Sequence, residues 1–281
     1  MGLLIFKLGP VLASLFLSFT QYDIISAPEW IGLNNYSKLL NDDLWLTSVR
    51  VTLRYVGLFV PSALVTAYAI AMLMSRDVKG IYFYRTIWYL PSVVPAVASA
   101  TIWRWGLNPE FGPINYPLKW LGLPAPRWLT DPDWIVPSIV FISLWGLGNT
   151  VLIFLAAIKA CQPRSTRRLK WTAGRWTLPP RHPAHDVVDH LLSAHCQYYR
   201  QLSGLGVAYV LFVRNSSASS AGPNNAALFY VLYMYRNAFG YFRNGYASAM
   251  AWVLFVVIML LTALLFYSQR RWVYYETEGA G

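Results

Sequence analysis

The sequence is poor in charged residues. Asp, Glu, Lys and Arg make up 12% of its 281 residues, whereas about a quarter is usual in a soluble domain. Hydrophobic residues make up 56% and aromatic residues 16%. This composition argues against an ordinary water-soluble globule.

The sequence also lacks the motifs of several chemical functions. Its 2 cysteines, Cys161 and Cys196, are too few for a disulfide framework, and no CxxC or CxxCH pattern surrounds them. There is no Gly-Lys dipeptide of a phosphate-binding loop, no GxGxxG and no GxSxG. We therefore expect this chain to have no enzyme activity, no catalytic residue and no cofactor of its own, so that any nucleotide hydrolysis comes from a partner.

Acidic residues are scarce relative to basic ones. The chain has 12 Asp and Glu against 23 Lys and Arg, for a net charge of +11 at pH 7. In a soluble protein this excess would suggest nucleic acid. Here the basic residues lie mainly in short segments between apolar runs, a pattern that orients membrane helices. We expect contact with membrane lipid and no nucleic acid partner.

Long apolar runs are what the sequence has in abundance. A run of roughly 17 to 25 residues crosses the ~30 Å hydrocarbon core as a helix. The runs predict an all-α, polytopic membrane protein with spans near 3–19, 51–74, 86–105, 134–158 and 245–268. Prolines inside these runs are interpreted as kinks, because a bundled membrane helix can satisfy the freed carbonyls. They are Pro61, Pro91, Pro95 and Pro137.

The charges between the runs predict the orientation. The basic loops after the second, fourth and last runs are expected on the cytoplasmic side, and the more acidic stretches 21–47 and 106–133 on the outer side. This arrangement requires one more crossing, near 187–213. There Asp186, Asp189 and Arg200 interrupt the apolar sequence. We expect about six transmembrane helices, of which the fifth is degraded.

Short motifs occur in a fixed order along the chain. They are Leu-Ser-Phe-Thr at 17–20, Trp-Ile-Gly-Leu-Asn-Asn-Tyr at 30–36, Phe-Tyr-Arg-Thr at 83–86, Leu-Pro-Ser-Val-Val-Pro at 90–95, Trp-Arg-Trp at 103–105, Asn-Pro-Glu-Phe-Gly at 108–112, Ser-Leu-Trp-Gly at 143–146, Gly-Pro-Asn-Asn-Ala at 222–226, Tyr-Arg-Asn-Ala-Phe at 235–239 and Gly-Tyr-Ala-Ser-Ala at 245–249. With these motifs the sequence resembles the inner-membrane permease subunits of bacterial ABC importers for carbohydrates, the group that contains the maltose and glycerol-phosphate permeases. The resemblance runs nearly end to end outside residues 161–214.

The resemblance implies a single transmembrane permease domain over residues 1–281 with a six-helix core, located in the bacterial inner membrane. It implies that the chain forms half of the translocation pathway of an ATP-driven sugar importer. The implied partners are a second permease subunit, an ATP-binding cassette ATPase that binds the ATP, and an extracytoplasmic sugar-binding protein.

The resemblance fails in the expected cytoplasmic coupling loop at 159–184. Permeases of this group carry Glu-Ala-Ala, three residues and Gly there, in a short helix that docks into the ATPase. The corresponding residues of this chain are Pro163, Arg164, Arg167, Arg168, Lys170 and Gly174. The codons of residues 165–173 can also be read in a shifted phase, in which the third base of each codon is combined with the first two bases of the next. This phase permits Tyr-Glu-Ala-Ala-Glu-Val-Asp-Gly, which contains the family's motif, here called the coupling hallmark. We therefore hypothesise a frame-shifted segment at about 160–207.

Other polar features suggest further sites. All four histidines and both cysteines fall within 161–214, but their spacings match neither HExxH nor a Cys2His2 zinc pattern, so we expect no metal site. Asn149 and Arg104 are candidate polar residues of the translocation path, because polar groups within a membrane are energetically expensive and often functional. An interhelical hydrogen bond is the alternative role for Asn149.

Two other functions stay open at this point. A secondary carrier or channel would show internal repeats and intramembrane charges for ion coupling. No repeat is found, and four of the spans have cores without any charged residue, at 55–74, 86–103, 134–158 and 245–268. A non-functional, frame-shifted permease would differ only in the degraded segment. The sugar-importer permease is therefore the leading hypothesis.

Overall fold

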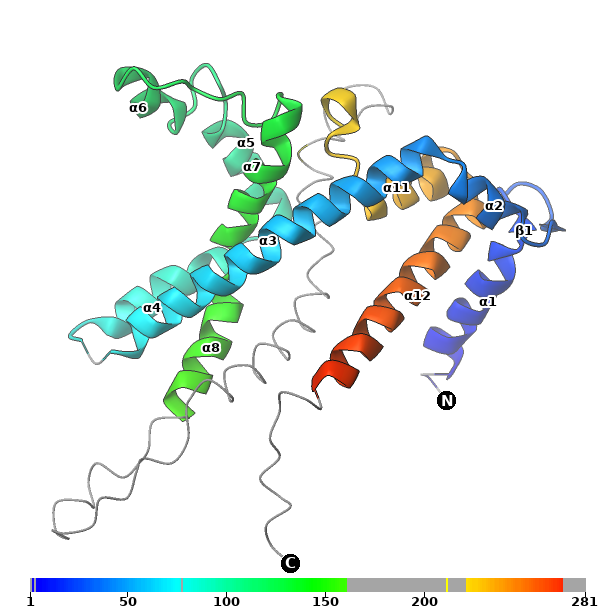
Figure 1. Ribbon diagram of the computed structural model, residues 1–281, viewed down its shortest axis with the longest axis horizontal. Helices are drawn as coiled ribbons and strands as arrows, with labels where there is room; N and C mark the ends of the chain where they lie inside the picture. Colours follow the sequence, from blue (N-terminus) through cyan, green and yellow to red (C-terminus); the bar gives the residue numbers. More distant parts are fainter. Residues whose placement is uncertain (1, 3, 77, 161–210, 212–220, 270–281) are drawn as a thin grey trace, which may run out of the picture. The chain divides into compact units, whose positions relative to one another are not determined.

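The computed structural model describes residues 2, 4–76, 78–160, 211 and 221–269, and these are mostly helical (Figure 1). The chain forms two compact units. Unit 1 consists of Met1–Gly57, Ala96–Ile139 and Ser203–Phe266, and unit 2 consists of Leu58–Pro95, Val140–Leu202 and Tyr267–Gly281. Each unit therefore draws on segments that are far apart in the sequence.

The N-terminal apolar run begins unit 1. A π-helical turn, η1 (Leu4–Leu8), continues directly into α1 (Gly9–Ser18). Pro10 is the second residue of α1, where the backbone changes from π-helical to α-helical, and it removes one helical donor there. A hairpin of β1 (Thr20–Gln21) and β2 (Glu29–Trp30) follows, and α2 (Asn34–Leu40) then leads to α3 (Asp43–Ser75). This hairpin is the exception to the expected all-α class among the described residues.

Helix α12 (Asn244–Gln269) lies in unit 1 as far as Phe266, and this part is antiparallel to α1 (Figure 1). The indole Nε1 of Trp252 donates a hydrogen bond to the Oγ of Ser14 (3.2 Å), and the backbone N–H of Gly245 donates to the carbonyl of Tyr22 (3.1 Å). A Cβ at position 245 would overlap the carbonyl oxygen of Thr20. Glycine therefore allows the start of α12 to sit directly against the chain that leaves α1.

A buried cluster joins the segment before α12 to the rest of unit 1. This segment contains η4 (Pro223–Asn225), α11 (Tyr230–Tyr235) and η5 (Arg236–Gly240). The backbone N–H of Tyr230 donates to the Oγ1 of Thr52 (2.9 Å), and its hydroxyl donates to the carbonyl of Met250 (2.8 Å). α11 is thereby fixed to α3 and α12. The cluster consists of Leu39, Ala221, Leu228, Tyr230, Leu232, Tyr233 and Met250.

The middle of the chain completes unit 1 with α5 (Ala96–Gly106), α6 (Asn115–Trp120) and the first part of α7 (Pro132–Trp145). Asn115 is fully buried. Its Oδ1 accepts a hydrogen bond from the indole of Trp128 (2.7 Å), and the Oγ of Ser138 donates to the carbonyl of Trp128 (2.9 Å). These bonds fix the stretch between α5 and α7 on the start of α7.

Unit 2 contains the second part of α3 with α4 (Ile81–Tyr89), the 3₁₀ segment η2 (Leu90–Val93) and α8 (Gly148–Ala160). The rings of Tyr68 in α3 and Phe154 in α8 pack edge to face, 6.2 Å apart. The guanidinium of Arg85 in α4 donates a hydrogen bond to the carbonyl of Met74 (2.7 Å). Met74 lies in the last turn of α3, so Arg85 satisfies a carbonyl that the helix leaves without a partner.

Two helices in the described residues, α3 and α12, are long and apolar enough to cross a membrane, and α7 with α8 adds a third if that bent pair is a single span. In α12 every side chain from Phe255 to Leu261 is exposed, so the helix is apolar around its whole circumference there. Such a surface needs lipid or another membrane chain to cover it.

The helices differ from the predicted spans in three places. α3 begins at Asp43 rather than at 51. The run 86–105 is not one helix, because α4, η2 and α5 divide it at Pro91 and Pro95. The run 134–158 is bent by 54° between α7 and α8. In contrast, α12 covers 245–268.

The prolines explain only part of these differences. Pro61 and Pro137 lie inside the helices α3 and α7, where a proline can bend a helix without ending it. Pro91 and Pro95 instead flank a change from 3₁₀ to extended backbone at Val94. Two prolines so close together remove two helical donors from one turn, which a single kink cannot accommodate. The expected fifth span at 187–213 lies outside the described residues except for Leu211, so the number of six helices stays a prediction.

Candidate functional site

Unit 2 holds two helix interruptions that lie against each other. α7 ends at Trp145 and α8 begins at Gly148, with a bend of 54°. The other interruption is η2. A Cβ on Gly148 would lie 3.0 Å from the Oγ of Ser92 and 3.1 Å from the Cα of Tyr89. The missing side chain of Gly148 therefore lets the start of α8 approach η2 closely.

Helix ends are polar, because the first four N–H groups and the last four carbonyls have no partner within the helix. Ser92 satisfies one such carbonyl, since its Oγ donates to the oxygen of Tyr89 (2.6 Å). At membrane depth, interrupted backbone is tolerated only where protein buries it or where it lines a water-filled cavity. In transporters, such discontinuous helices form solute sites. The two interruptions are therefore a candidate site for solute passage in unit 2.

Asn149, a residue singled out from the sequence, lies in the first turn of α8 at this place. Its side chain is half-buried and makes no hydrogen bond to any residue that the structure describes. The interhelical hydrogen bond considered above is thus not present within the described ranges. The amide has two donors and an acceptor to offer, which is the chemistry needed to bind a hydroxyl-bearing solute.

Arg104, the other predicted path residue, belongs to unit 1. It lies in the last turn of α5, where the partial negative charge of the helix C-terminus favours a cation. Its side chain is half-buried and has no ion-pair partner among the described residues. The structure thus places Arg104 in unit 1 and Asn149 in unit 2.

The predicted coupling loop at 159–184 lies outside the described residues from Cys161 onward. Pro163, Arg164, Arg167, Arg168, Lys170 and Gly174 all fall there, as do the histidines and cysteines of 161–214. Among the described residues there is no group of three or more His, Cys, Asp or Glu that could hold a metal ion. α8, which leads into the loop, has Lys159 in its last turn.

A carboxylate that the sequence did not single out links three segments of unit 1. The Oδ2 of Asp42 accepts hydrogen bonds from the hydroxyls of Tyr233 and Tyr246, both 2.6 Å long, and its Oδ1 accepts one from the backbone N–H of Leu44 (2.9 Å). Asp42 thus fixes the start of α3 to α11 and α12. No local sequence pattern predicts this, because the tyrosines are 191 and 204 residues away.

The tyrosines also stabilise the ionised form of Asp42. Burial alone would raise the pKa of this carboxyl, but the hydrogen bonds from Tyr233, Tyr246 and the backbone outweigh it and lower the pKa below its ordinary value. Burial raises the pKa of Tyr233, and its hydrogen bond to the Asp42 carboxylate raises it further. At neutral pH the carboxylate is therefore ionised and Tyr233 is a neutral donor.

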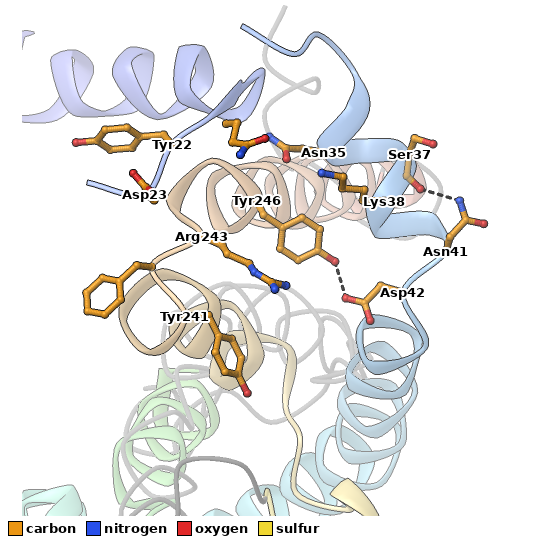
Figure 2. A pocket seen from close by; sticks show the side chains of 12 residues that line it. Tyr22, Asp23, Asn35, Ser37, Lys38, Asn41, Asp42, Tyr241, Arg243 and Tyr246 are labelled. Atoms are coloured by element: carbon orange, nitrogen blue, oxygen red, sulfur yellow. Dashed lines mark hydrogen bonds between the residues drawn. The ribbon is translucent and has the colours of Figure 1, made fainter. Parts of the chain in front are cut away.

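An open pocket of about 800 Å³ lies beside Asp42, within unit 1 (Figure 2). Its walls come from the chain after α1, from α2 and from the chain around the start of α12. The lining is mostly polar and aromatic. It consists of Gln21, Tyr22, Asp23, Asn35, Ser37, Lys38, Asn41, Asp42, Tyr241, Phe242, Arg243 and Tyr246.

Comparison with known proteins identifies what the chain is similar to. No family model matches it. The probable ABC transporter permease protein YesP of Bacillus subtilis is 36% identical over 290 residues, which cover 99% of this chain and 89% of YesP. The diacetylchitobiose uptake system permease protein NgcF of Streptomyces coelicolor is 28% identical over 95% of this chain and 78% of its own length.

A solved structure has the same fold. A chain of a bacterial alginate ABC transporter, crystallised in complex with a periplasmic protein that holds an alginate pentasaccharide, superimposes with a TM-score of 0.77. The match covers 96% of this chain and 90% of that chain, at 21% identity. The helices described above, with their interruptions, are thus arranged in an importer-permease fold.

Proposed function

The chain belongs to the permease proteins of ABC transporters, and from this membership we propose how its parts serve sugar import. It is a transmembrane permease subunit of an ATP-driven sugar importer and not an enzyme. The observation that carries this conclusion is the 36% identity to a permease over 99% of the chain. A secondary carrier or channel finds no support among the relatives.

The chain supplies half of the translocation pathway, and a second permease subunit supplies the other half, in the bacterial inner membrane. The exposed apolar circumference of α12 supports this arrangement, because it needs lipid or another helical subunit around it. An ATP-binding cassette ATPase binds the ATP, and an extracytoplasmic sugar-binding protein delivers the sugar.

The interrupted helices of unit 2 line part of the pathway. Asn149 at the start of α8 offers hydrogen bonds to sugar hydroxyls, and the packing of Gly148 on Ser92 holds the two interruptions together. Arg104 is a second polar residue of the pathway in unit 1. A hydroxyl-rich solute loses bound water on entering the membrane, so replacement hydrogen bonds at the helix ends lower the cost of its passage.

The loop at 159–184 is the coupling element to the ATPase, in degraded form. Its four basic residues, Arg164, Arg167, Arg168 and Lys170, stand where the family has acidic and small residues. Reversing the sign of charge across a docking contact weakens the contact. We infer that the chain as written couples poorly, which keeps a non-functional, frame-shifted permease as the second candidate.

Purification with native partners tests the proposal. The chain should copurify with a second permease and an ATPase, and ATP hydrolysis should require that ATPase. In proteoliposomes, uptake of a panel of radiolabelled sugars should require ATP and the binding protein, at least for a version with the coupling hallmark restored. ATP hydrolysis by this chain alone, or uptake driven by an ion gradient without the ATPase, would contradict the assignment.

A further inference from the structure

The pocket beside Asp42 lies at the end of unit 1 where α1 ends and where α3 and α12 begin (Figure 2). Its lining residues from Gln21 to Asp42 belong to the stretch 21–47, whose charges predict the extracytoplasmic side. Its volume of about 800 Å³ falls within the range of small-molecule sites, roughly 300 to 1,000 Å³. It is large enough for one or two sugar rings.

The formal charges of the lining residues sum to zero, but the acidic and basic side chains differ in whether they have hydrogen-bond partners within the chain. Both oxygens of Asp42 accept hydrogen bonds from within the chain, and the Oδ1 of Asp23 accepts two, from the N–H and the hydroxyl of Ser26 (2.8 and 2.6 Å). Both oxygens of Asp42 and one oxygen of Asp23 therefore have neutral donors within the chain.

The two cations of the lining are not satisfied in this way. Lys38 from α2 and Arg243 from the turn before α12 are both exposed, and neither makes a side-chain hydrogen bond or an ion pair with any residue in the described part of the chain. The guanidinium of Arg243 lies 5.9 Å from the ring centre of Tyr241. The pocket thus offers unused donors with positive charge, together with an aromatic ring.

Aromatic rings complete this chemistry. Tyr241 and Phe242, next to Arg243, are about half exposed (49% and 50%) and line the pocket with Tyr22. A flat aromatic face packs against the C–H face of a pyranose ring. A guanidinium fits a carboxylate through two parallel hydrogen bonds, and an ammonium adds a further charged donor.

We propose that this pocket binds an acidic saccharide, with the uronate carboxylate on Lys38 and Arg243 and the sugar ring against Tyr241. The inference rests on the proposed function, because it assigns a saccharide class to the outer face of a sugar permease. A phospholipid headgroup or a simple anion could use the same cations. Neither of them would use the aromatic ring as a platform for a pyranose.

Binding to the full chain with its partners, in phosphatidylcholine nanodiscs without ATP, tests the proposal. The probes are methyl β-D-glucuronide and its methyl ester, which keeps the ring and removes the carboxylate charge. Saturation-transfer NMR should show binding of the glucuronide at least about tenfold tighter than that of the ester, because a charged hydrogen-bonding partner is lost. Equal binding of the two probes would overturn the proposal.

Variants locate the site. Lys38→Gln and Arg243→Gln should each weaken glucuronide binding roughly tenfold, whereas Arg243→Lys should weaken it less and Tyr241→Leu should weaken binding of both probes. The matched controls are Lys119→Gln and Arg127→Gln, which lie in unit 1 outside the pocket. Unchanged binding in the pocket variants, or equal loss in the controls, would place the ligand elsewhere.

Two further arms distinguish other anions. Inorganic phosphate that displaces the glucuronide at equal concentration would identify a simple anion site. Loss of glucuronide binding in phosphatidylglycerol nanodiscs would identify a lipid headgroup site, and either result would overturn the proposal. Because binding is measured without ATP, a chain that fails to transport can still bind the glucuronide. ATP-driven uptake of neutral sugar without glucuronide binding would refute this inference alone.

Discussion

The hydroxyl of Tyr246 donates a 2.6 Å hydrogen bond to the Oδ2 of Asp42, which lies 204 residues earlier in the sequence. Tyr233 donates a second bond of the same length to the same oxygen. One carboxylate therefore holds together the starts of α3 and α12 and the short helix α11. The pocket lined by Lys38 and Arg243 depends on this arrangement, because Asp42 and Tyr246 form part of its wall.

Removal of this carboxylate should destabilise the protein. In Asp42→Ala two tyrosine hydroxyls lose a charged acceptor, at a cost of about 2 to 3 kcal/mol. Asp43→Ala is the matched control, because Asp43 is exposed in the first turn of α3 and should contribute well under about 1 kcal/mol through the helix dipole. Thermal unfolding of the detergent-purified variants measures the difference. Equal midpoints for the two variants would contradict the linking role of Asp42.

The same contact predicts a pH dependence. Because the folded protein lowers the pKa of Asp42 below its ordinary value of 3.8, the stabilisation is fully present above that value. It is lost as the pH falls through the lower, folded pKa. The difference in unfolding midpoint between the wild type and Asp42→Ala should therefore be constant from about pH 6 down to about pH 4.5 and should shrink toward about pH 3. A difference that grows on acidification would have the wrong sign.

Asn149 should affect transport more than stability. In Asn149→Ala the helix start keeps its fold, since no described residue bonds to this amide, and the solute loses one hydrogen-bonding group. Uptake should fall roughly tenfold, as expected for one unmatched polar group, with an unchanged unfolding midpoint. Asn34→Ala, at an exposed asparagine of α2, is the control. Transport should be measured in the version with the hallmark restored. Equal uptake in the two variants would remove Asn149 from the pathway.

Cysteine labelling should report the orientation. Asn35 lies in the stretch 21–47 that is predicted on the outer side, but it is a poor labelling position. Its side chain is 4% exposed, and its Nδ2 donates to the carbonyls of Ser18 and Thr20. Single cysteines at the exposed residues Asn34 and Asn224 should instead react with an impermeant maleimide from outside intact cells, and a cysteine at Lys79 only after permeabilisation. Cys161 and Cys196 are replaced by serine in this background. Outside labelling at position 79 would reverse the predicted topology.

Restoring the coupling hallmark should restore transport. The coding DNA across codons 159 to 222 should encode the coupling hallmark in the shifted phase. A gene corrected to that phase should then encode a loop with Glu-Ala-Ala followed, after three residues, by Gly. We expect the restored chain to retain the ATPase during purification and to import sugar, whereas the chain as written does neither, because Arg164, Arg167, Arg168 and Lys170 reverse the charge of the docking contact. Equal import by both versions would refute the functional consequence of the frame slip.

The sequence by itself determined the membrane class, the runs that become α3 and α12, and the family, because apolar run length, loop charge and motif order are local properties that need no knowledge of packing. The sequence shows where the prolines fall in these runs, but not whether each one stays within a helix or interrupts it. Pro61 stays within a helix, and Pro91 and Pro95 break one. Only the tertiary structure decided that Gly148 lies on Ser92 and that Asp42 receives hydrogen bonds from Tyr233 and Tyr246. These contacts join segments distant in the chain, and their partners are selected by helix packing, which no local pattern encodes.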